Sequence, residues 1–203
     1  MGNTTTRDDI VTAADQLFYR QGYESTSFSD IADAVRISRG NFYYHFKSKD
    51  DILDAVIALR LENTRTMLHR WESDSGDPAD RIRSFIHILV ANQATIMRYG
   101  CPVGTLCAEL AKRDHAAQGE ANKVFGLFRT WLGRQFALLG RAAEADALAM
   151  HLLARSQGVA TLANAFCDDA FVQREVRQMC DWLKSVAKGR GHPGPARKGR
   201  TCE

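Results

Sequence analysis

Long apolar runs and paired cysteines are scarce in this sequence of 203 residues. No run of about 18 apolar residues occurs, so we expect no membrane-spanning helix. The first nine residues contain no apolar stretch, and we therefore expect no secretory signal there. The five cysteines are odd in number and have no paired spacing, which argues against a secreted disulfide framework. These absences favour a protein that acts in the reducing cytoplasm and does not enter a membrane.

Sequence motifs of enzymes and of metal sites are missing as well. The sequence has no His-Glu-x-x-His motif, no phosphate-binding loop, no nucleophile elbow and no Cys-x-x-Cys pair. Four histidines lack the spacing of metal ligands: His69, His87, His115 and His151. We therefore expect no enzyme activity, no cofactor and no metal ion.

Positive charge is concentrated in two short segments of a chain whose net charge is only +3. From residue 188 onward five basic residues stand against one acid, so the preceding residues are close to neutral overall. A second cluster occupies residues 34–49, which contain no acid: Arg36, Arg39, Lys47 and Lys49. A local positive cluster in an otherwise neutral chain indicates a polyanionic partner. The terminal cluster is either a solvated tail or a nonspecific attractor of phosphate.

Apolar residues recur at helical spacing along most of the chain, and no alternating β-branched run indicates a strand. Suitable N-caps precede five of the expected helices: Thr6, Ser27, Ser38, Ser48 and Asp77, the last followed by Pro78 at the first helical position. The expected helices occupy about residues 6–21, 28–35, 39–46, 49–71, 78–99, 102–112, 124–139, 144–167 and 169–187.

Residues 27–49 carry the most informative pattern. A short helix, a three-residue turn and a second short helix form a helix-turn-helix arrangement. In the second helix Phe42 and Phe46 supply the core side, whereas the other positions combine polar and aromatic side chains. Such a face is unusual against solvent but suits the major groove of DNA.

Individual side chains of this second helix match known modes of base recognition. Arg39 is able to donate two hydrogen bonds to guanine, Asn41 to read adenine, and Tyr43 to contact a thymine methyl group or a phosphate. Gly40 lets the helix backbone approach the duplex. The alternative for Tyr43, Tyr44 and His45 is partial burial against a neighbouring helix. Phosphate contacts are expected from residues at helix starts or in the following turn: Ser27, Lys47 and Lys49.

The N-terminal quarter of the chain resembles the TetR family of transcriptional repressors. The resemblance lies in Ala13–Phe18, Gly22-Tyr23, Thr26-Ser27, Ile31-Ala32 and Ile37–Asp50. It implies a homodimer of about nine helices per chain that a small ligand releases from a DNA operator. Carried over by position, and joined to the residues above, the expected DNA-binding residues are Ser27, Ser38, Arg39, Gly40, Asn41, Tyr43, Tyr44, His45, Lys47 and Lys49. Residues 1–50 hold six basic and seven acidic residues, so affinity must come from local charge.

The resemblance and the helical pattern together predict an all-α fold. We expect a helix-turn-helix DNA-binding domain over residues 1–48 and a long connecting helix over 49–72. A ligand-binding and dimerisation domain is expected over 77–188, followed by a disordered basic tail over 189–203. The last two helices, about 144–167 and 169–187, are expected to pair with those of a second subunit. Small residues would allow close approach there: Ala154, Gly158, Ala160 and Ala163.

A ligand pocket in this family shares its helices with the hydrophobic core. The pocket candidates are therefore apolar, aromatic or reactive residues of the second domain: Phe85, Met97, Tyr99, Cys101, Phe128, Trp131 and Phe166. Plain core packing is the alternative for Phe85, Met97, Phe128 and Trp131.

Cys101 occupies a distinctive position before Pro102. It is placed to cap a helix N-terminus, where the helix dipole favours the thiolate over the thiol. The Gly-Cys start of this helix also resembles a TetR-family branch that senses electrophiles and oxidants through a cysteine. We therefore predict that Cys101 is the most reactive thiol, with a purely structural turn as the alternative. Cys107 is expected to be a small buried residue.

The sequence thus predicts a ligand-responsive transcriptional regulator, most simply a repressor. Its expected partners are a double-stranded DNA operator with a palindromic sequence, a small-molecule or electrophilic inducer, and a second copy of the chain. A helical protein–protein adaptor without DNA binding is the alternative, but it leaves the face of residues 39–49 unexplained.

Overall fold

The computed structural model describes residues 5–189, which form helices joined by short loops and contain no strand. Residues 190–203 of the expected basic tail lie outside the described residues. The described part contains ten α-helices, with a π turn at Ala137–Arg141 and a 3-10 turn at Ala142–Glu144. The helices are α1 (Thr6–Gln21), α2 (Phe28–Val35), α3 (Arg39–His45), α4 (Lys49–Asp74), α5 (Pro78–Ala91), α6 (Gln93–Tyr99), α7 (Pro102–Lys112), α8 (Gln118–Phe136), α9 (Ala145–Phe166) and α10 (Asp169–Lys188).

Reciprocal side-chain caps begin three of the first four helices. Ser27 with Asp30 caps α2, and Ser48 with Asp51 caps α4, each side chain accepting the other residue's backbone N–H. Thr5 with Asp8 caps α1 in the same way, so the expectation that Thr6 is the cap was wrong. The hydrogen bonds explain the difference, because Thr5 closes the pair with Asp8 and Thr6 becomes the first helical residue.

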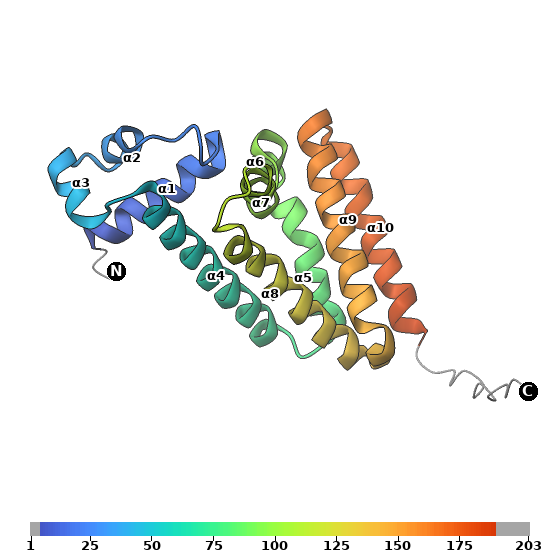
Figure 1. Ribbon diagram of the computed structural model, residues 1–203. Coiled ribbons are helices and arrows are strands. Elements are labelled where there is room, and N and C mark those ends of the chain that lie inside the picture. Colours follow the sequence, from blue (N-terminus) through green and yellow to red (C-terminus); the bar gives the residue numbers. More distant parts are fainter. Residues whose placement is uncertain (1–4, 190–203) are drawn as a thin grey trace, which may run out of the picture.

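Helices α1–α3 form a separate unit at one end of the molecule, and α4 leads from it to the remaining helices (Figure 1). The core of this unit is apolar and fully buried, and its largest side chains come from α1–α3 and from the start of α4: Ile10, Ile31, Phe42, Ile52 and Leu53. The first part of α4 therefore packs on α1, while its later part packs on α8. This shared helix ties the N-terminal unit mechanically to the second domain.

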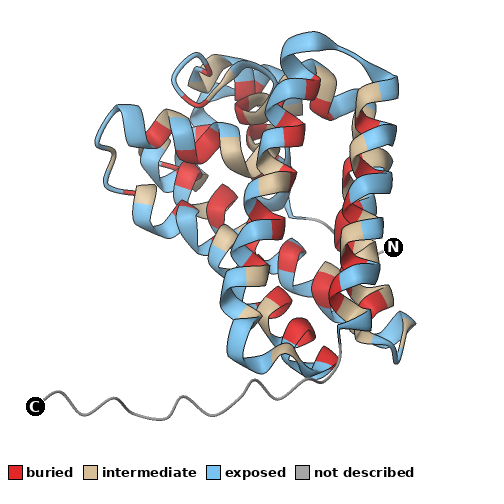
Figure 2. Ribbon diagram, turned by 90° about the vertical axis from the view of Figure 1, so that its right-hand side faces the viewer, coloured by how far each residue is buried: buried red, intermediate tan, exposed pale blue. Residues whose placement is uncertain are grey.

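The second domain is built from the long helices α5, α8, α9 and α10, with the short α6 and α7 near the N-terminal unit (Figure 1). Buried positions recur along each helix with exposed positions between them, as amphipathic packing requires (Figure 2). Helix α8 contacts both α4 and α9, whereas α10 packs on α5 and α9. Within the described residues, no helix has both the length and the apolar character needed to cross a membrane.

One expected helix, 78–99, is interrupted at Asn92. The backbone of Asn92 leaves the helical region (φ −111°, ψ 15°), and its side-chain amide donates to the carbonyl of Ile88 at 3.0 Å. This local bond gives a carbonyl group at the C-terminal end of α5 a hydrogen-bond partner, so that α5 ends and α6 begins after Asn92. The interruption accounts for ten helices where about nine were expected.

The small residues of α9 do not all face outward as predicted. Ala160 and Ala163 are buried inside the subunit, at 2% and 1% exposure, and so cannot contact a second copy. Ala154 and Gly158 are exposed. Two large apolar residues continue their four-residue spacing, Leu162 at 44% and Phe166 at 71% exposure. The outward stripe of α9 is thus more apolar than predicted.

Candidate DNA-binding surface and effector cavity

Helix α3 presents two different faces. Phe42 and Phe46 are 1% and 2% exposed. The Phe42 ring packs against Phe28 of α2, and the guanidinium of Arg7 in α1 lies over the Phe46 ring. Ser38 caps the helix by accepting the backbone N–H of Asn41 at 3.3 Å. The opposite face is open to solvent, with Tyr43 at 46% and Tyr44 at 78% exposure. The core contacts therefore orient the helix so that its remaining side chains point away from the protein.

The predicted DNA-contact residues of this face differ in their exposure to solvent and in the contacts they already make within the protein. Arg39 and Asn41 are exposed, and Arg39 makes one bond, from its guanidinium to the Ser29 hydroxyl at 3.0 Å. The ring of Tyr43 packs edge-on against Phe28, with centroids 5.6 Å apart, yet the residue remains 46% exposed. His45 is half-buried and contacts the ring of Tyr44.

The residues expected to contact phosphates lie around this face. The Ser27 and Ser38 oxygens accept capping bonds, and each hydroxyl hydrogen still has the capacity to donate to a phosphate. Lys47 is exposed, and its ammonium donates to the carbonyl of Tyr43. Lys49 is already engaged, since its ammonium donates to the carbonyl of Glu24 at 2.9 Å and lies 4.4 Å from the Tyr23 ring centre.

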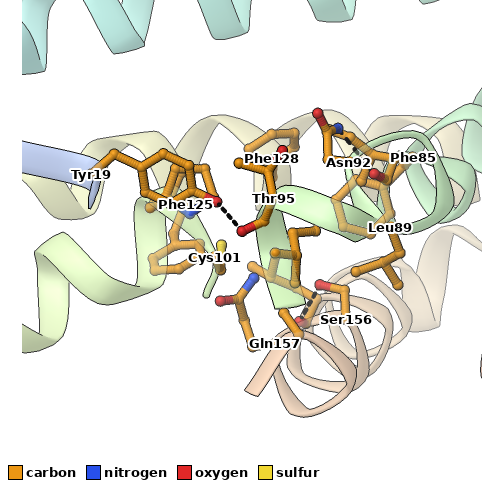
Figure 3. A pocket seen from close by; sticks show the side chains of 16 residues that line it. Tyr19, Phe85, Leu89, Asn92, Thr95, Cys101, Phe125, Phe128, Ser156 and Gln157 are labelled. Atoms are coloured by element: carbon orange, nitrogen blue, oxygen red, sulfur yellow. Dashed lines mark hydrogen bonds between the residues drawn. The ribbon is translucent and has the colours of Figure 1, made fainter. Parts of the chain in front are cut away.

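A cavity of about 180 Å³ lies among α5, α6, α7, α8 and α9 of the second domain, with Tyr19 of α1 at one side (Figure 3). Its wall is mostly apolar, with aromatic rings from α5 and α8 and aliphatic side chains from α5, α6, α7 and α9. Tyr19 enters from α1 and Gln157 from α9 (Figure 3). Tyr19 was missed from sequence, although an aromatic side chain beside the buried stripe of α1 was a usable signal.

Three of the seven predicted pocket residues line this cavity: Phe85, Cys101 and Phe128. The other four lie elsewhere. Trp131 is buried in the core against Trp71, Tyr99 stacks edge-on against the ring of Tyr19, Met97 packs on the core, and Phe166 is 71% exposed. Helical spacing identifies which residues point inward, but it does not show which of them border a void.

Cys101 caps α7 as predicted, and Pro102 is the first helical residue. Its sulfur accepts the backbone N–H of Gly104 at 3.4 Å, and the half-buried side chain reaches the cavity. Cys107 is buried at 9% exposure, which confirms the prediction, and burial raises the pKa of its thiol. Within the described residues, Cys101 is thus the only cysteine that combines the helix start with the cavity wall.

The wall of the cavity is bonded directly to α1. The Tyr19 hydroxyl donates to the carbonyl of Gly100 at 2.7 Å and lies 3.3 Å from that of Thr95, so it joins the ends of α6 and α7 to α1. Burial raises the pKa of Tyr19 to about 12, so the hydroxyl stays protonated and keeps donating at neutral pH. Arg60 of α4 donates to the carbonyl of Pro102 and to Asp15, both at 2.6 Å.

Glu109 makes a second connection, from α7 to the loop between α1 and α2. Its carboxylate accepts the backbone N–H groups of Tyr23 at 3.0 Å and Glu24 at 2.9 Å. Gly22, which ends α1 with φ 93°, lies against this carboxylate. A side chain at Gly22 would strain the backbone and crowd Glu109. The short helix α7 therefore holds the loop that begins the helix-turn-helix.

Comparison with known proteins places these features in a family. Residues 10–56 match the family model of bacterial regulatory proteins, tetR family. An uncharacterized HTH-type transcriptional regulator in the lacX 3' region of Lactococcus lactis subsp. lactis is 30% identical over 157 residues, which cover 75% of this chain and 80% of that protein. The HTH-type transcriptional repressor DhaR of Mycobacterium sp. (strain GP1) is 26% identical over 168 residues, 78% of this chain and 82% of the repressor.

The fold comparison agrees with the sequence comparison. The crystal structure of a TetR transcriptional regulator from Legionella pneumophila superimposes with a TM-score of 0.78 at 24% identity, covering 90% of this chain and 99% of that one. That likeness shows the all-α fold with an N-terminal helix-turn-helix domain. The chain belongs to the TetR family of transcriptional regulators, which bind DNA through this domain and are not enzymes.

Proposed function

We propose that the protein is a repressor that binds a palindromic operator as a homodimer and is released when a small molecule fills the cavity. The observation that carries the proposal is the dual position of Tyr19. Its ring belongs to the wall of the cavity, and its helix belongs to the DNA-binding unit. A ligand that displaces this ring therefore acts on α1 directly.

Recognition of DNA is assigned to the open face of α3. Arg39, Asn41 and Tyr43 read bases in the major groove, while Tyr44 and His45 extend the same surface. Ser27, Ser38, Lys47 and Lys49 contact phosphates, and Gly40 permits close approach because nothing lies within 4 Å of the position its Cβ would occupy. Lys49 must exchange its bonds to the α1–α2 loop for the phosphate contact.

The test of this assignment begins with operator sites selected from genomic DNA by the purified protein. Arg39→Ala is expected to lower affinity for the selected site by about 1–3 kcal/mol, as loss of a bidentate base contact does. Arg65→Ala, which removes an exposed positive charge of α4, is the matched control and should leave affinity nearly unchanged. An adaptor without DNA binding would show no salt-dependent affinity for duplex DNA, whereas a DNA binder shows a log–log slope of about −0.9 per phosphate contacted.

The dimer is assigned to α9 and α10, which lie side by side at the opposite end of the molecule from α1–α3 (Figure 1). On the exposed stripe of α9, the small residues Ala154 and Gly158 allow a helix of the second copy to approach closely. Leu162 and Phe166 supply apolar surface that the contact would bury. A two-fold dimer presents two α3 helices to half-sites separated by about 34–36 Å or a multiple of it. An inverted-repeat operator follows from this symmetry.

Release is a shift between two dimer populations. One form has its α3 helices at the operator spacing, and the other has them displaced. Ligand shifts the equilibrium only as far as it binds the displaced form more tightly. Tyr19, Arg60 and Glu109 provide the bonds through which the cavity wall and α1 move together.

An electrophile acts at the same place through Cys101. The thiolate sulfur adds to the β-carbon of an activated alkene, an S–C bond forms as the π bond breaks, and the α-carbon takes a proton from water. Treatment with N-ethylmaleimide, read by mass spectrometry beside operator release, tests this route. Cys101→Ser should resist release by the reagent. Equal release of the variant would leave a noncovalent ligand as the inducer.

A further inference from the structure

We infer that the cavity binds an uncharged, mostly apolar molecule about the size of one substituted aromatic ring, with one hydrogen-bonding group that meets Gln157. The inference rests on the proposed function, since it names the class of ligand that occupies the same cavity. It follows from three properties of the wall, namely its charge, its size and one amide that makes no hydrogen bond to the described residues.

The cavity wall excludes ions. None of the side chains that line it belongs to Asp, Glu, Lys, Arg or His. A charged ligand would therefore lose its hydration without gaining a counter-charge. The nearest charged pair, Arg60 and Asp15, lines a neighbouring cleft that shares Tyr19 with the cavity, but the two groups are bonded to each other at 2.6 Å. Their charges are thus already compensated.

The volume of about 180 Å³ sets the size of the ligand. An apolar cavity of about 150 Å³ is known to hold one benzene molecule. Phe85 and Phe128 meet edge to face with ring centres 5.5 Å apart, and Phe125 adds a third ring. Aromatic edges and faces favour a further ring in such a space. A second fused ring would take up most of this volume and leave little room for a substituent.

Gln157 supplies the polar anchor. Within the described residues its side-chain amide makes no hydrogen bond, unlike its neighbour Ser156, whose hydroxyl donates to the carbonyl of Leu153 at 2.7 Å. The amide of Gln157 lies toward the Cys101 side of the cavity (Figure 3). It offers both a donor and an acceptor, so a hydroxyl, carbonyl or amide on the ring completes its bonding.

Gly104 makes room for this amide. A Cβ built on Gly104 would lie 2.6 Å from the Gln157 side-chain oxygen, so any larger residue forces the amide to move. Gly104 thus helps to set specificity without contacting the ligand. Gly104→Ala is expected to alter affinity for a ligand with a hydrogen-bonding group more than affinity for a plain hydrocarbon.

The experiment measures binding of matched one-ring probes to the full chain without DNA, by saturation-transfer NMR titration. Benzyl alcohol is expected to bind about tenfold or more tightly than either benzoate or benzylammonium. It should also bind more tightly than 2-naphthalenemethanol, which carries a second ring. Equal or tighter binding of either ion, or of the two-ring probe, overturns the inference.

Two variants assign the binding to this cavity. Gln157→Ala should weaken benzyl alcohol several-fold, by about one hydrogen bond, and leave toluene unchanged. Ala160→Leu, which fills the cavity, should abolish binding of both probes. Full binding by Ala160→Leu, or equal loss of both probes in Gln157→Ala, overturns the assignment. If benzyl alcohol binds as expected but no ligand affects operator affinity, the proposed function fails while the ligand class stands.

Discussion

In the proposed mechanism, Tyr19 links recognition of a ligand to recognition of DNA through one hydroxyl group. The ring forms part of the cavity wall, and the hydroxyl bonds the break between α6 and α7. Removal of the oxygen alone leaves the wall in place and cuts the connection. The position therefore allows ligand binding and signal transmission to be separated experimentally.

Tyr19→Phe is expected to bind benzyl alcohol nearly as well as the parent chain but to respond less. The lost hydrogen bond is worth about 0.5–1.5 kcal/mol, which predicts a roughly two- to tenfold smaller effect of ligand on operator affinity. Fluorescence anisotropy of labelled operator, with and without ligand, measures the effect. Tyr99→Phe, on the ring beside Tyr19, is the control. An undiminished response in Tyr19→Phe would assign transmission to other bonds.

Sequence patterns predicted the exposed face of α3 better than the lining of the cavity, and residue-scale physics explains why. Phe42 and Phe46 fix the orientation of α3 by simple periodicity, so the outward residues follow from the inward ones. The position of a cavity depends on how all the surrounding side chains pack, which helical spacing does not show. Trp131 points inward as predicted, but its ring packs against Trp71 in the core and does not border the cavity. Tyr19 was marked only by its place beside the apolar stripe of α1, and no pattern marked the polar residue Gln157.

At the scale of elements, local bonds decided where helices begin and end. The serine caps of α2, α3 and α4 were readable because a cap needs only its neighbours. Thr5 and Thr6 are the same residue type and equally suitable as N-caps, and only the hydrogen bonds with Asp8 show that Thr5 is the cap. The interruption at Asn92 was hidden because apolar spacing continues on both sides of it.

The capping boxes predict a loss of N-terminal structure in acid. Bonds from Ser27 and Ser48 lower the pKa of Asp30 and of Asp51 below the ordinary 3.8. A lowered folded pKa means that each carboxylate stabilises the fold fully above pH of about 3.8, and that this contribution is lost as pH falls through the lowered value. Circular dichroism during acid titration should show the transition. Asp30→Asn should have less pH-dependent stability in this range, and an unchanged profile would contradict the assignment.

Glu109 is expected to stabilise the junction between α7 and the α1–α2 loop. Glu109→Gln keeps the size of the side chain but turns a donating NH₂ group toward one of two backbone N–H donors. We expect the free energy of unfolding in urea to fall by about 1–3 kcal/mol, the range for a hydrogen bond to a charged group. Glu120→Gln, in an exposed pair with Lys123, should change it little. Equal effects of the two substitutions would argue against a special role for Glu109.

At the scale of the whole molecule, the exposed stripe of α9 would set the assembly in the proposed dimer. Leu162 and Phe166 of α9 leave large apolar side chains in solvent, and α9 itself lies across the molecule from α1–α3 (Figure 1). Burying them against a second copy removes this exposed area and fixes the separation of the two α3 helices. The same contact thus decides both oligomeric state and operator geometry.

The double variant Leu162→Asp/Phe166→Asp is expected to be a monomer with weak operator affinity. Analytical ultracentrifugation measures the mass, and operator binding is followed by anisotropy. Leu138→Asp introduces the same charge at another exposed apolar residue, outside α9, and should remain dimeric. A dimeric double variant would place the interface elsewhere.

The place of Tyr19 limits how freely regulators of this kind exchange parts. A chimera that joins residues 1–48 of a relative to residues 49–189 of this chain would inherit new operator specificity, yet it would also replace one wall of the chamber that senses the ligand. Its response to the original ligand is expected to be lost with any small residue at position 19 and regained when tyrosine is restored there. A boundary drawn at the end of the helix-turn-helix places Tyr19 in the DNA-binding part, although its ring lines the cavity. Exchange of operator specificity without loss of ligand specificity therefore requires that this residue be kept.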